Sequence, residues 1–531
     1  MRRCGARAIM LERPAALAAP QPMKKLLSPL AIAAVHALIQ WHVMHGAVGP
    51  ARDGARYFRY ALRLDGEPWS AVIRTSVDHP GYPMLLHGAF RVARAIGAES
   101  PHALLLAAQL ATSLCGLLFL LISHRVLRRL WGELVATVSV LCLAALPRPA
   151  YTFADVLSDP LHAFLCMTSL ALLLRASARA VREAPRAPKS GLWAAAAAGV
   201  VGAMAYCVRV DALTLPVAIV LAAAGTALAG GARQPLRARV IGAYAAGFAA
   251  GAAPFGVMIG GLSSKPVLGE LFLRGGWVDA GAAWPFVAVT TMLPGAGILA
   301  AAGAVFRDLG QEVQWVHVAT AGLSLPFFVR RGGARTGSTG SAAVAFAAAW
   351  FAVHTAAIVA VEWRHGYASS RYFLPVLPFL IAAGVEGARR ASRWLRLEWK
   401  GRPLLVGAVV VASIAAALPS FLRSRLHESS AGGLAAGRWV AEHIGANDVV
   451  HDPAFFPSYL AGLAARVRPI EEDFSAPTRR LIIAEDSQVP QIPRLPQWIA
   501  GGKGRRIASF PRREGGSDLG AGVYEVGPNP P

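Results

Sequence analysis

The sequence predicts a mainly α, polytopic membrane protein of about eleven spans, with a long first outer loop and a small C-terminal α/β domain. Three observations predict this fold. Hydrophobic residues make up 55% of the 531 residues and charged residues only 16%, whereas about a quarter of a soluble domain is charged. Long apolar segments recur through most of the chain. The last part of the chain instead carries short apolar segments separated by Pro and Gly.

The basic residues are distributed along the chain as they are in membrane proteins. The net charge is +23, but only six of the 53 basic residues are Lys, and most Arg residues lie in short clusters between apolar segments. This is the distribution that the positive-inside rule predicts. We therefore expect membrane partners and no nucleic acid.

The N-terminus is read as a cytoplasmic basic segment, residues 1–25, followed by a membrane anchor. No small-residue cleavage site follows its first apolar run, which argues against a signal peptide. A span needs about 20 apolar residues. Twelve segments qualify: 26–44, 103–126, 131–147, 160–176, 191–208, 210–229, 237–260, 284–306, 312–329, 343–362, 371–388 and 404–421.

The Arg-rich loops reduce twelve spans to eleven. If 284–306 and 312–329 both crossed the membrane, the basic segment that begins at Arg330 would lie outside. We exclude 284–306, because its Pro294-Gly-Ala-Gly interruption is typical of a re-entrant or interfacial element. The predicted domains are a transmembrane domain at 26–421, with outer loops 45–102 and 261–311, and an extracytoplasmic α/β domain at 422–531.

The C-terminal domain has a predicted helix and three predicted strands. Residues 433–444 have the pattern of an amphipathic helix, and 449–451, 481–484 and 522–526 the pattern of short buried strands. Pro and Gly at 488–503 and 511–522 mark loops.

Two polar motifs follow the first span. Asp53 precedes Arg56 and Tyr57, and an acid this close to a membrane face is costly unless it is solvated or paired. The simplest interpretation is that Asp53 offsets Arg52 or Arg56 in a solvated loop. The second motif is Asp78-His79-Pro80-Gly81-Tyr82-Pro83, which we interpret as a shaped turn, because its prolines and glycine disfavour a helix.

In this order and spacing, the motifs resemble the GT-C superfamily of membrane glycosyltransferases, and are similar to those of the protein O-mannosyltransferases and lipid A aminoarabinose transferases. Three further segments match: Ser158-Asp159-Pro160, Arg209 at the end of a span, and Arg371-Tyr372-Phe-Leu-Pro375-Val-Leu-Pro378. The resemblance covers residues 26–421. The predicted topology places all these motifs on the outer side of the membrane.

The resemblance implies an inverting transferase that moves a hexose or pentose from a polyprenyl-phosphate donor to a lipid, glycan or protein acceptor. It implies that Asp53 is the catalytic base. Because Arg binds phosphate bidentately, Arg371, Arg209 and Arg56 are expected at the donor phosphate, although Arg209 could equally be a snorkelling anchor. The residues expected to shape the pocket are Tyr57, His79, Tyr82, Asp155, Asp159 and Tyr372.

Some roles stay open at this stage. His79 either fixes its turn or binds the donor phosphate. Asp155 and Asp159 either cap the span at Pro160, assist as second carboxylates or hold a divalent cation, the one cofactor left open. Many relatives carry two adjacent acids where this chain has Asp53-Gly54, so this chain would depend more on Asp155 or Asp159.

The expected location is a bacterial inner membrane, with a cytoplasmic N-terminus and an outer C-terminal domain. Two alternatives remain from the sequence: a non-enzymatic component of polysaccharide or lipid translocation, and a catalytically inactive relative.

Overall fold

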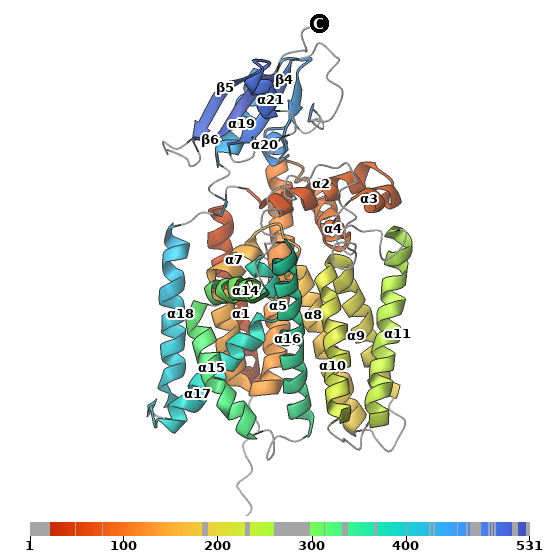
Figure 1. The fold of residues 1–531 in the computed structure, drawn as a ribbon, viewed down its shortest axis with the longest axis vertical. Coiled ribbons are helices and arrows are strands. Elements are labelled where there is room, and N and C mark those ends of the chain that lie inside the picture. The colour runs from red at the N-terminus through yellow and green to blue at the C-terminus, as the bar shows by residue number, and fades with distance from the viewer. Residues whose placement is uncertain are drawn as a thin grey trace, which may run out of the picture.

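The structure is a computed structural model that describes residues 22–47, 49–76, 78–182, 189–228, 234–259, 298–312, 314–331, 338–365, 369–399, 401–423, 426–427, 431–453, 455–463, 466–467, 479–486, 489, 492, 495–511 and 519–526. A bundle of long helices forms the body of the molecule, short helices cover one end of it, and a sheet domain stands beyond them (Figure 1).

The bundle consists of α1 (Pro22–His45), α5 (Pro101–Trp131), α6 (Glu133–Ala145), α7 (Pro147–Ala154), α8 (Asp159–Arg182), α9 (Lys189–Val208), α10 (Thr214–Leu228), α11 (Gln234–Ile259), α14 (Ile298–Glu312), α15 (Gln314–Arg331), α16 (Ser338–His365), α17 (Leu377–Trp394) and α18 (Leu404–Arg423). Two 3-10 turns, η1 (Val210–Leu213) and η2 (Ser370–Phe373), precede α10 and α17. A short hairpin, β1 (Glu398–Trp399) and β2 (Arg402–Pro403), joins α17 to α18.

Among the described residues, seven helices are long and apolar enough to cross a membrane: α1, α5, α8, α9, α11, α16 and α18. An eighth span results if α6 and α7, which are bent by 68°, are one broken span. A described helix lies on each of the eleven predicted spans, but the count of eleven stays a prediction, because α10, α15 and α17 do not meet the same criteria.

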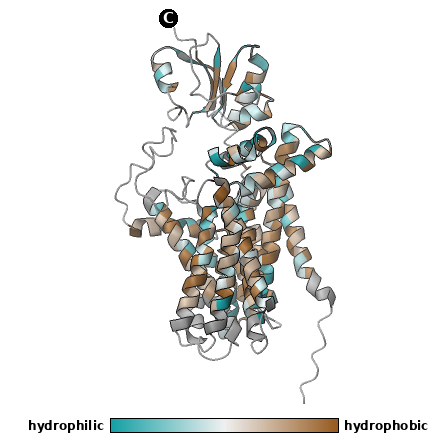
Figure 2. Ribbon diagram, turned by 90° about the vertical axis from the view of Figure 1, so that its right-hand side faces the viewer, coloured by the Kyte–Doolittle hydropathy of each residue, from teal (hydrophilic) through white to brown (hydrophobic). Residues whose placement is uncertain are grey.

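The surface of the bundle has the character of a lipid-facing wall. On α5, the side chains of Leu106, Leu110, Leu114 and Leu118 recur every four residues and are exposed, so they form one stripe along the helix. Most of the bundle is coloured hydrophobic in Figure 2, and hydrophilic residues are more frequent in the layer above it. The protein is therefore a multi-pass membrane protein, as predicted.

The helix α9, which Arg209 follows in the chain, packs closely against α11. A Cβ atom at Gly199 of α9 would lie 2.0 Å from the carbonyl oxygen of Tyr244 in α11. Only glycine permits this approach, which is typical of packed membrane helices.

The start of one predicted late span needs correction. The predicted span 371–388 begins as an α-helix only at Leu377. Residues 370–373 form the η2 turn instead, and Pro375 and Pro378 have no backbone N–H to donate to a continuous helix. Arg371 therefore lies in the η2 turn. In the predicted outer loop 261–311, residues 298–311 are helical and belong to α14; most of that loop, and most of the segment 284–306, lies outside the described residues.

The segment 45–102, predicted as the first outer loop, folds into a helical layer: α2 (Arg52–Gly66), α3 (Trp69–Thr75) and α4 (Gly81–Ala95). The turn expected at 78–83 is partly wrong. Pro80 caps α4, but Gly81 and Pro83 lie inside its first turn, where backbone amides have no partner within the helix and proline is tolerated.

The C-terminal domain is a four-stranded sheet with the order β3 (Val449–His451), β4 (Arg480–Glu485), β6 (Leu519–Val526) and β5 (Gly504–Pro511). β3 pairs parallel with β4, and the other pairs are antiparallel. Leu481 and Ile483 of β4 pack in the same core as Val440 of α19 (Ala431–His443), whereas Ile482 packs in a second core with Leu495 of α21 (Leu495–Ala500). Both faces of β4 are covered, so its sequence is apolar at successive positions.

The predicted small α/β domain is confirmed. Its helix and the strands at 449–451, 481–484 and 522–526 are present. The sequence analysis missed β5 and placed α21 in a loop. A further short helix, α20 (Phe456–Leu460), contacts the layer below, where the rings of Phe456 and Tyr459 lie 5.3 and 5.0 Å from that of Phe58 in α2.

Candidate active site

Asp53 is held in the first turn of α2, at the end of the bundle below the sheet domain. The side chain is 30% exposed, so a substrate can reach it. A Cβ atom at Gly54 would lie 2.7 Å from the carbonyl oxygen of Val156, so α2 passes directly over the segment that joins α7 to α8. Gly54 is thus a packing requirement.

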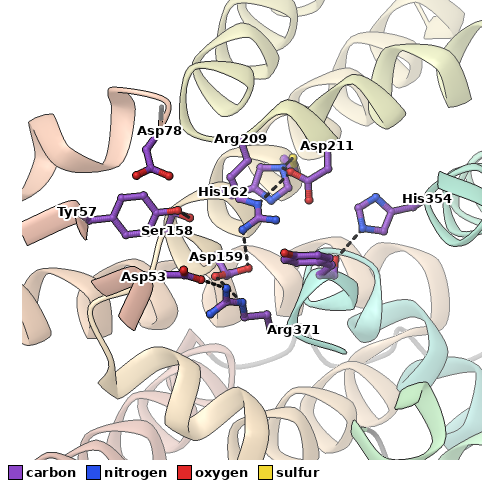
Figure 3. Close-up of polar contacts among 12 residues, drawn as sticks. Asp53, Tyr57, Asp78, Ser158, Asp159, His162, Arg209, Asp211, His354 and Arg371 are labelled. Carbon is purple, nitrogen blue, oxygen red and sulfur yellow. Dashed lines mark hydrogen bonds and ion pairs between the residues drawn. The ribbon is translucent and has the colours of Figure 1, made fainter. Parts of the chain in front are cut away.

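Two arginines from distant segments meet the carboxylate of Asp53. Arg371, in the η2 turn, hydrogen-bonds to its Oδ2 atom, and Arg56 approaches its Oδ1 atom at 3.3 Å from the next turn of α2. Arg56 also donates to Asp78 at 3.1 Å. Figure 3 shows Asp53 and Arg371 in direct contact, with Asp159 beside them.

Arg209 forms the second half of the same network. It follows α9 and donates to Asp159 at 3.0 Å and to Asp211 at 3.0 Å. Its guanidinium lies 4.6 Å from the centre of the Tyr372 ring, a cation–π contact. The Nε atom of Arg371 lies 3.8 Å from Asp159, so Asp159 joins the two arginines.

Deeper side chains hold this network in place. His162 of α8 lies 3.7 Å from Asp211. His354 of α16 lies 2.7 Å from the carbonyl oxygen of Tyr372 and 2.9 Å from the hydroxyl of Thr214. Residues from α8, α10 and α16 therefore support Asp211 and Tyr372, two of the groups that contact Arg209.

The predicted pocket residues fall into separate groups. Tyr57 bonds to Ser158 at 3.1 Å and contacts the ring of Tyr82 edge to face, and Tyr82 bonds to Thr112 at 2.6 Å. His79 is buried, 5.5 Å from the ring of Tyr206 and 5.4 Å from that of Phe255. These contacts place His79 in the wall that supports α4 and not in the charged network.

Asp155 and Asp159 have different surroundings. Asp159 is the first residue of α8, and its carboxylate contacts Arg209 and Arg371. Asp155 accepts hydrogen bonds from the backbone amides of Ala51 and Val156 at 2.9 and 2.7 Å, and from His427 at 2.7 Å. Asp159 thus belongs to the charged network, whereas Asp155 joins three segments of chain.

The network keeps Asp53 ionised. Burial raises the pKa of Asp53, but the positive charges of Arg371 and Arg56 and the hydrogen bond from Arg371 outweigh burial and hold the pKa below its ordinary value. Burial alone would lower the pKa of Arg371. The negative charges of Asp159 and Asp53 outweigh burial and hold this pKa above its ordinary value. Asp53 is therefore a carboxylate, able to accept a proton, at neutral pH.

The acids of the site do not form a metal-binding set. Among the described residues, no group of three or more His, Cys, Asp or Glu side chains is placed to hold a metal ion. Asp53 and Asp159 face guanidinium groups, and both oxygens of Asp155 accept hydrogen bonds. These residues do not fit a resident divalent cation.

Seven of the predicted residues meet in the charged network or lie against it: Asp53, Arg56, Tyr57, Asp159, Arg209, Arg371 and Tyr372, whose ring stacks on Arg209. The sequence analysis did not assign Asp211, His162, His354 or Asp78 to the site. His162 and His354 carried a usable signal, because polar residues within apolar spans need a reason. Asp78 lies inside a quoted motif and Asp211 lies two residues after Arg209, at positions to which the resemblance gave no role.

Comparison with known proteins shows the fold. No protein-family model matches the sequence, and no curated protein matches it. The chain is similar to the crystal structure of ArnT from Cupriavidus metallidurans bound to undecaprenyl phosphate, with 13% identity over 95% of this chain and 98% of that one, and a TM-score of 0.58.

The chain is also similar to the archaeal oligosaccharyltransferase AglB from Archaeoglobus fulgidus, solved with an inhibitory peptide and a dolichol-phosphate. The identity is 14%, the match covers 88% of this chain and 70% of that one, and the TM-score is 0.55. A second structure of the Archaeoglobus fulgidus oligosaccharyltransferase, with zinc and sulfate, covers 87% of this chain and 68% of that one at 14% identity and a TM-score of 0.54. The fold that the resemblance implied is therefore shared with these solved structures.

Proposed function

We propose that the protein is an inverting glycosyltransferase that moves a sugar from a polyprenyl-phosphate donor to an acceptor at the outer face of a bacterial inner membrane. One observation carries the proposal: an ionised carboxylate, Asp53, lies against Arg371 in a partly open site at one end of an apolar bundle. The fold supports it, since ArnT and AglB were solved with lipid phosphates.

The arginines suit the phosphate of such a donor. The polyprenyl tail stays among the apolar helices, and the phosphate lies at the end of the bundle, where Arg371 and Arg56 have side chains that are 21% and 37% exposed. A bound phosphate offers Arg371 a stronger, bidentate partner than Asp53. The Asp53 carboxylate is then released to face the acceptor.

Arg209 has a different role in this proposal. It is 16% exposed and already bound by Asp159, Asp211 and the ring of Tyr372. A cation held this firmly stabilises charge that develops on the phosphate without having to move. The expectation that Arg209 is only a snorkelling anchor does not account for these contacts.

The transfer is a single displacement. The acceptor oxygen or nitrogen attacks the anomeric carbon, and its proton passes to the Asp53 carboxylate. The bond between the anomeric carbon and the phosphate oxygen breaks with its electron pair going to the phosphate, which leaves as polyprenyl phosphate. The arginines stabilise the second negative charge of the leaving phosphate, and attack from the opposite face inverts the anomeric carbon.

The direct test is turnover by the purified full chain in lipid nanodiscs. Undecaprenyl-phosphate-linked hexoses and pentoses are supplied one at a time with cell-envelope lipids, glycans and proteins as acceptors. We expect one donor to be consumed, free undecaprenyl phosphate to appear, and one acceptor to gain the mass of the sugar. If every donor stays intact, the proposal fails. If proteoliposomes then move the donor between leaflets, translocation replaces it.

A further inference from the structure

The start of α2 is attached to the segment 155–158 at three successive points. The amide of Ala51 donates to Asp155 at 2.9 Å, Gly54 packs on the carbonyl group of Val156, and Tyr57 bonds to Ser158 at 3.1 Å. Asp53 lies between the first two points. The position of its carboxylate therefore depends on where residues 155–158 hold this end of α2.

The carboxylate of Asp155 is the point where these segments of the chain meet, and we call its set of hydrogen bonds the junction. Its side chain is 3% exposed, and its Oδ1 atom accepts from two amides, those of Ala51 and Val156. The Oδ2 atom accepts from Nε2 of His427 at 2.7 Å. A buried carboxylate without its third partner would be costly, so His427 completes the junction.

His427 comes from the link between the membrane domain and the C-terminal domain. It follows α18 and precedes α19, and its φ angle of 57° is one that residues other than glycine rarely adopt. The preceding Leu426 is buried against Val43 and Ala154. The link is thus anchored at the α7–α8 corner in a conformation that places the imidazole on Asp155.

The C-terminal domain also contacts α2 at a second point. Phe456 and Tyr459 of α20 pack against Phe58, and Arg59 lies 5.6 Å from the ring of Phe455. The domain therefore holds the helix that carries Asp53 from its link and from its own lower surface.

We propose that His427 is a positioning residue, which ties the link of the C-terminal domain to the start of α2 through Asp155 and so fixes Asp53 for catalysis. The inferred effect of His427 on catalysis rests on the proposed function. The inferred attachment of α2 through His427 and Asp155 does not. It gives the C-terminal domain a role in catalysis that needs no contact with either substrate.

The test combines hydrogen–deuterium exchange with kinetics on the full chain in nanodiscs. In His427→Ala, we expect faster exchange in peptides that cover residues 51–60, with no substrate present. The kcat should fall between about tenfold and a hundredfold, because small misplacements of reacting groups have effects of this size. The KM for the donor should stay within about twofold, because the hydrogen bond of His427 is to Asp155 and not to Arg371 or Arg56, the proposed phosphate-binding arginines.

Two further variants separate positioning from general damage. His427→Gln keeps a side-chain N–H donor and should restore most of the protection and the kcat. His443→Ala removes an exposed imidazole of the same domain, bonded only within α19 to the carbonyl oxygen of Trp439, and should behave as wild type. If His427→Ala does not fold, Asp155→Asn takes its place, since Asn keeps the Oδ1 acceptor but presents an N–H group to His427.

The outcomes distinguish the two proposals. Unchanged exchange at 51–60 would overturn the inference whatever the activity. Faster exchange with wild-type kcat would also overturn it, because Asp53 would not depend on the junction. If wild type itself transfers no sugar, the proposed function fails, and the exchange data still decide whether His427 holds α2.

Discussion

The guanidinium of Arg371 contacts the carboxylate of Asp53, although 318 residues separate them. This pair joins α2 to the η2 turn, which precedes α17. Without a bound ligand, each group neutralises the other. In the proposed mechanism, a donor phosphate that draws Arg371 away both binds the lipid and frees the Asp53 carboxylate, so donor binding prepares Asp53 to act as the base.

Replacing Arg371 should weaken donor binding. Arg371→Lys keeps the charge but loses the bidentate geometry. We expect the Kd for undecaprenyl phosphate to rise about 10- to 100-fold, as for loss of a charge-assisted hydrogen bond of about 1.5–3 kcal/mol. Titration of the lipid into nanodiscs measures this. Arg63→Lys, on an exposed pair with Glu67 in the same layer, should bind normally; equal binding by both variants would remove Arg371 from the phosphate site.

The acid limb of the pH profile should report the charges around Asp53. The pKa of Asp53 is held below its ordinary value of 3.8, so the base stays ionised, and activity is lost only as pH falls through that lowered pKa. Arg56→Gln removes one of the lowering charges and should move the acid limb of kcat/KM to higher pH. A limb that stays in place, or moves to lower pH, would show that another group titrates.

Adding a methyl group at the start of α2 should have a larger effect than adding one at its end. Gly54→Ala places a Cβ atom 2.7 Å from the carbonyl oxygen of Val156, whereas a Cβ atom at Gly66 meets nothing within 4 Å. We expect Gly54→Ala to destabilise the protein by about 1–3 kcal/mol and to lower kcat as Asp53 is displaced. Thermal unfolding and turnover of both variants check this; matching results would contradict the close approach.

Removal of divalent cations should leave turnover unchanged. The described acids of the site are engaged with arginines, amides and His427 instead of forming a metal-binding group. The measurement is turnover in EDTA, followed by readdition of Mg²⁺, Mn²⁺ or Zn²⁺. Loss of activity that one of these ions restores would show that the described acids do not represent the whole site.

The sequence predicted the parts of this molecule that depend on local pattern. Continuous apolar segments located the helices of the bundle, and the apolar run at 481–484 located a strand that is covered on both faces. It was less successful where proline changed the start of a helix, as at Gly81 and Leu377. Proline restricts its own residue and the one before it, but tolerates the first turn, so the motif alone did not fix the boundary.

The site was predictable where the resemblance named a residue, and otherwise only in part. The resemblance named Asp53, Arg209 and Arg371, and the structure brings these three residues into one network. The role of Asp155 depends on His427, 272 residues away in a linker without any recognisable motif. A contact of this kind exists only in the folded chain, so no spacing along the sequence could have indicated it.

The central claim is that Asp53 takes the proton from the acceptor. The most direct measurement compares single-turnover transfer by Asp53→Asn with that by Asp65→Asn, the same substitution in the same helix at an acid paired with Arg94 and His87. The account predicts a loss of at least about a hundredfold in the first variant, with donor binding retained, and near wild-type transfer in the second. Wild-type transfer by Asp53→Asn would contradict it.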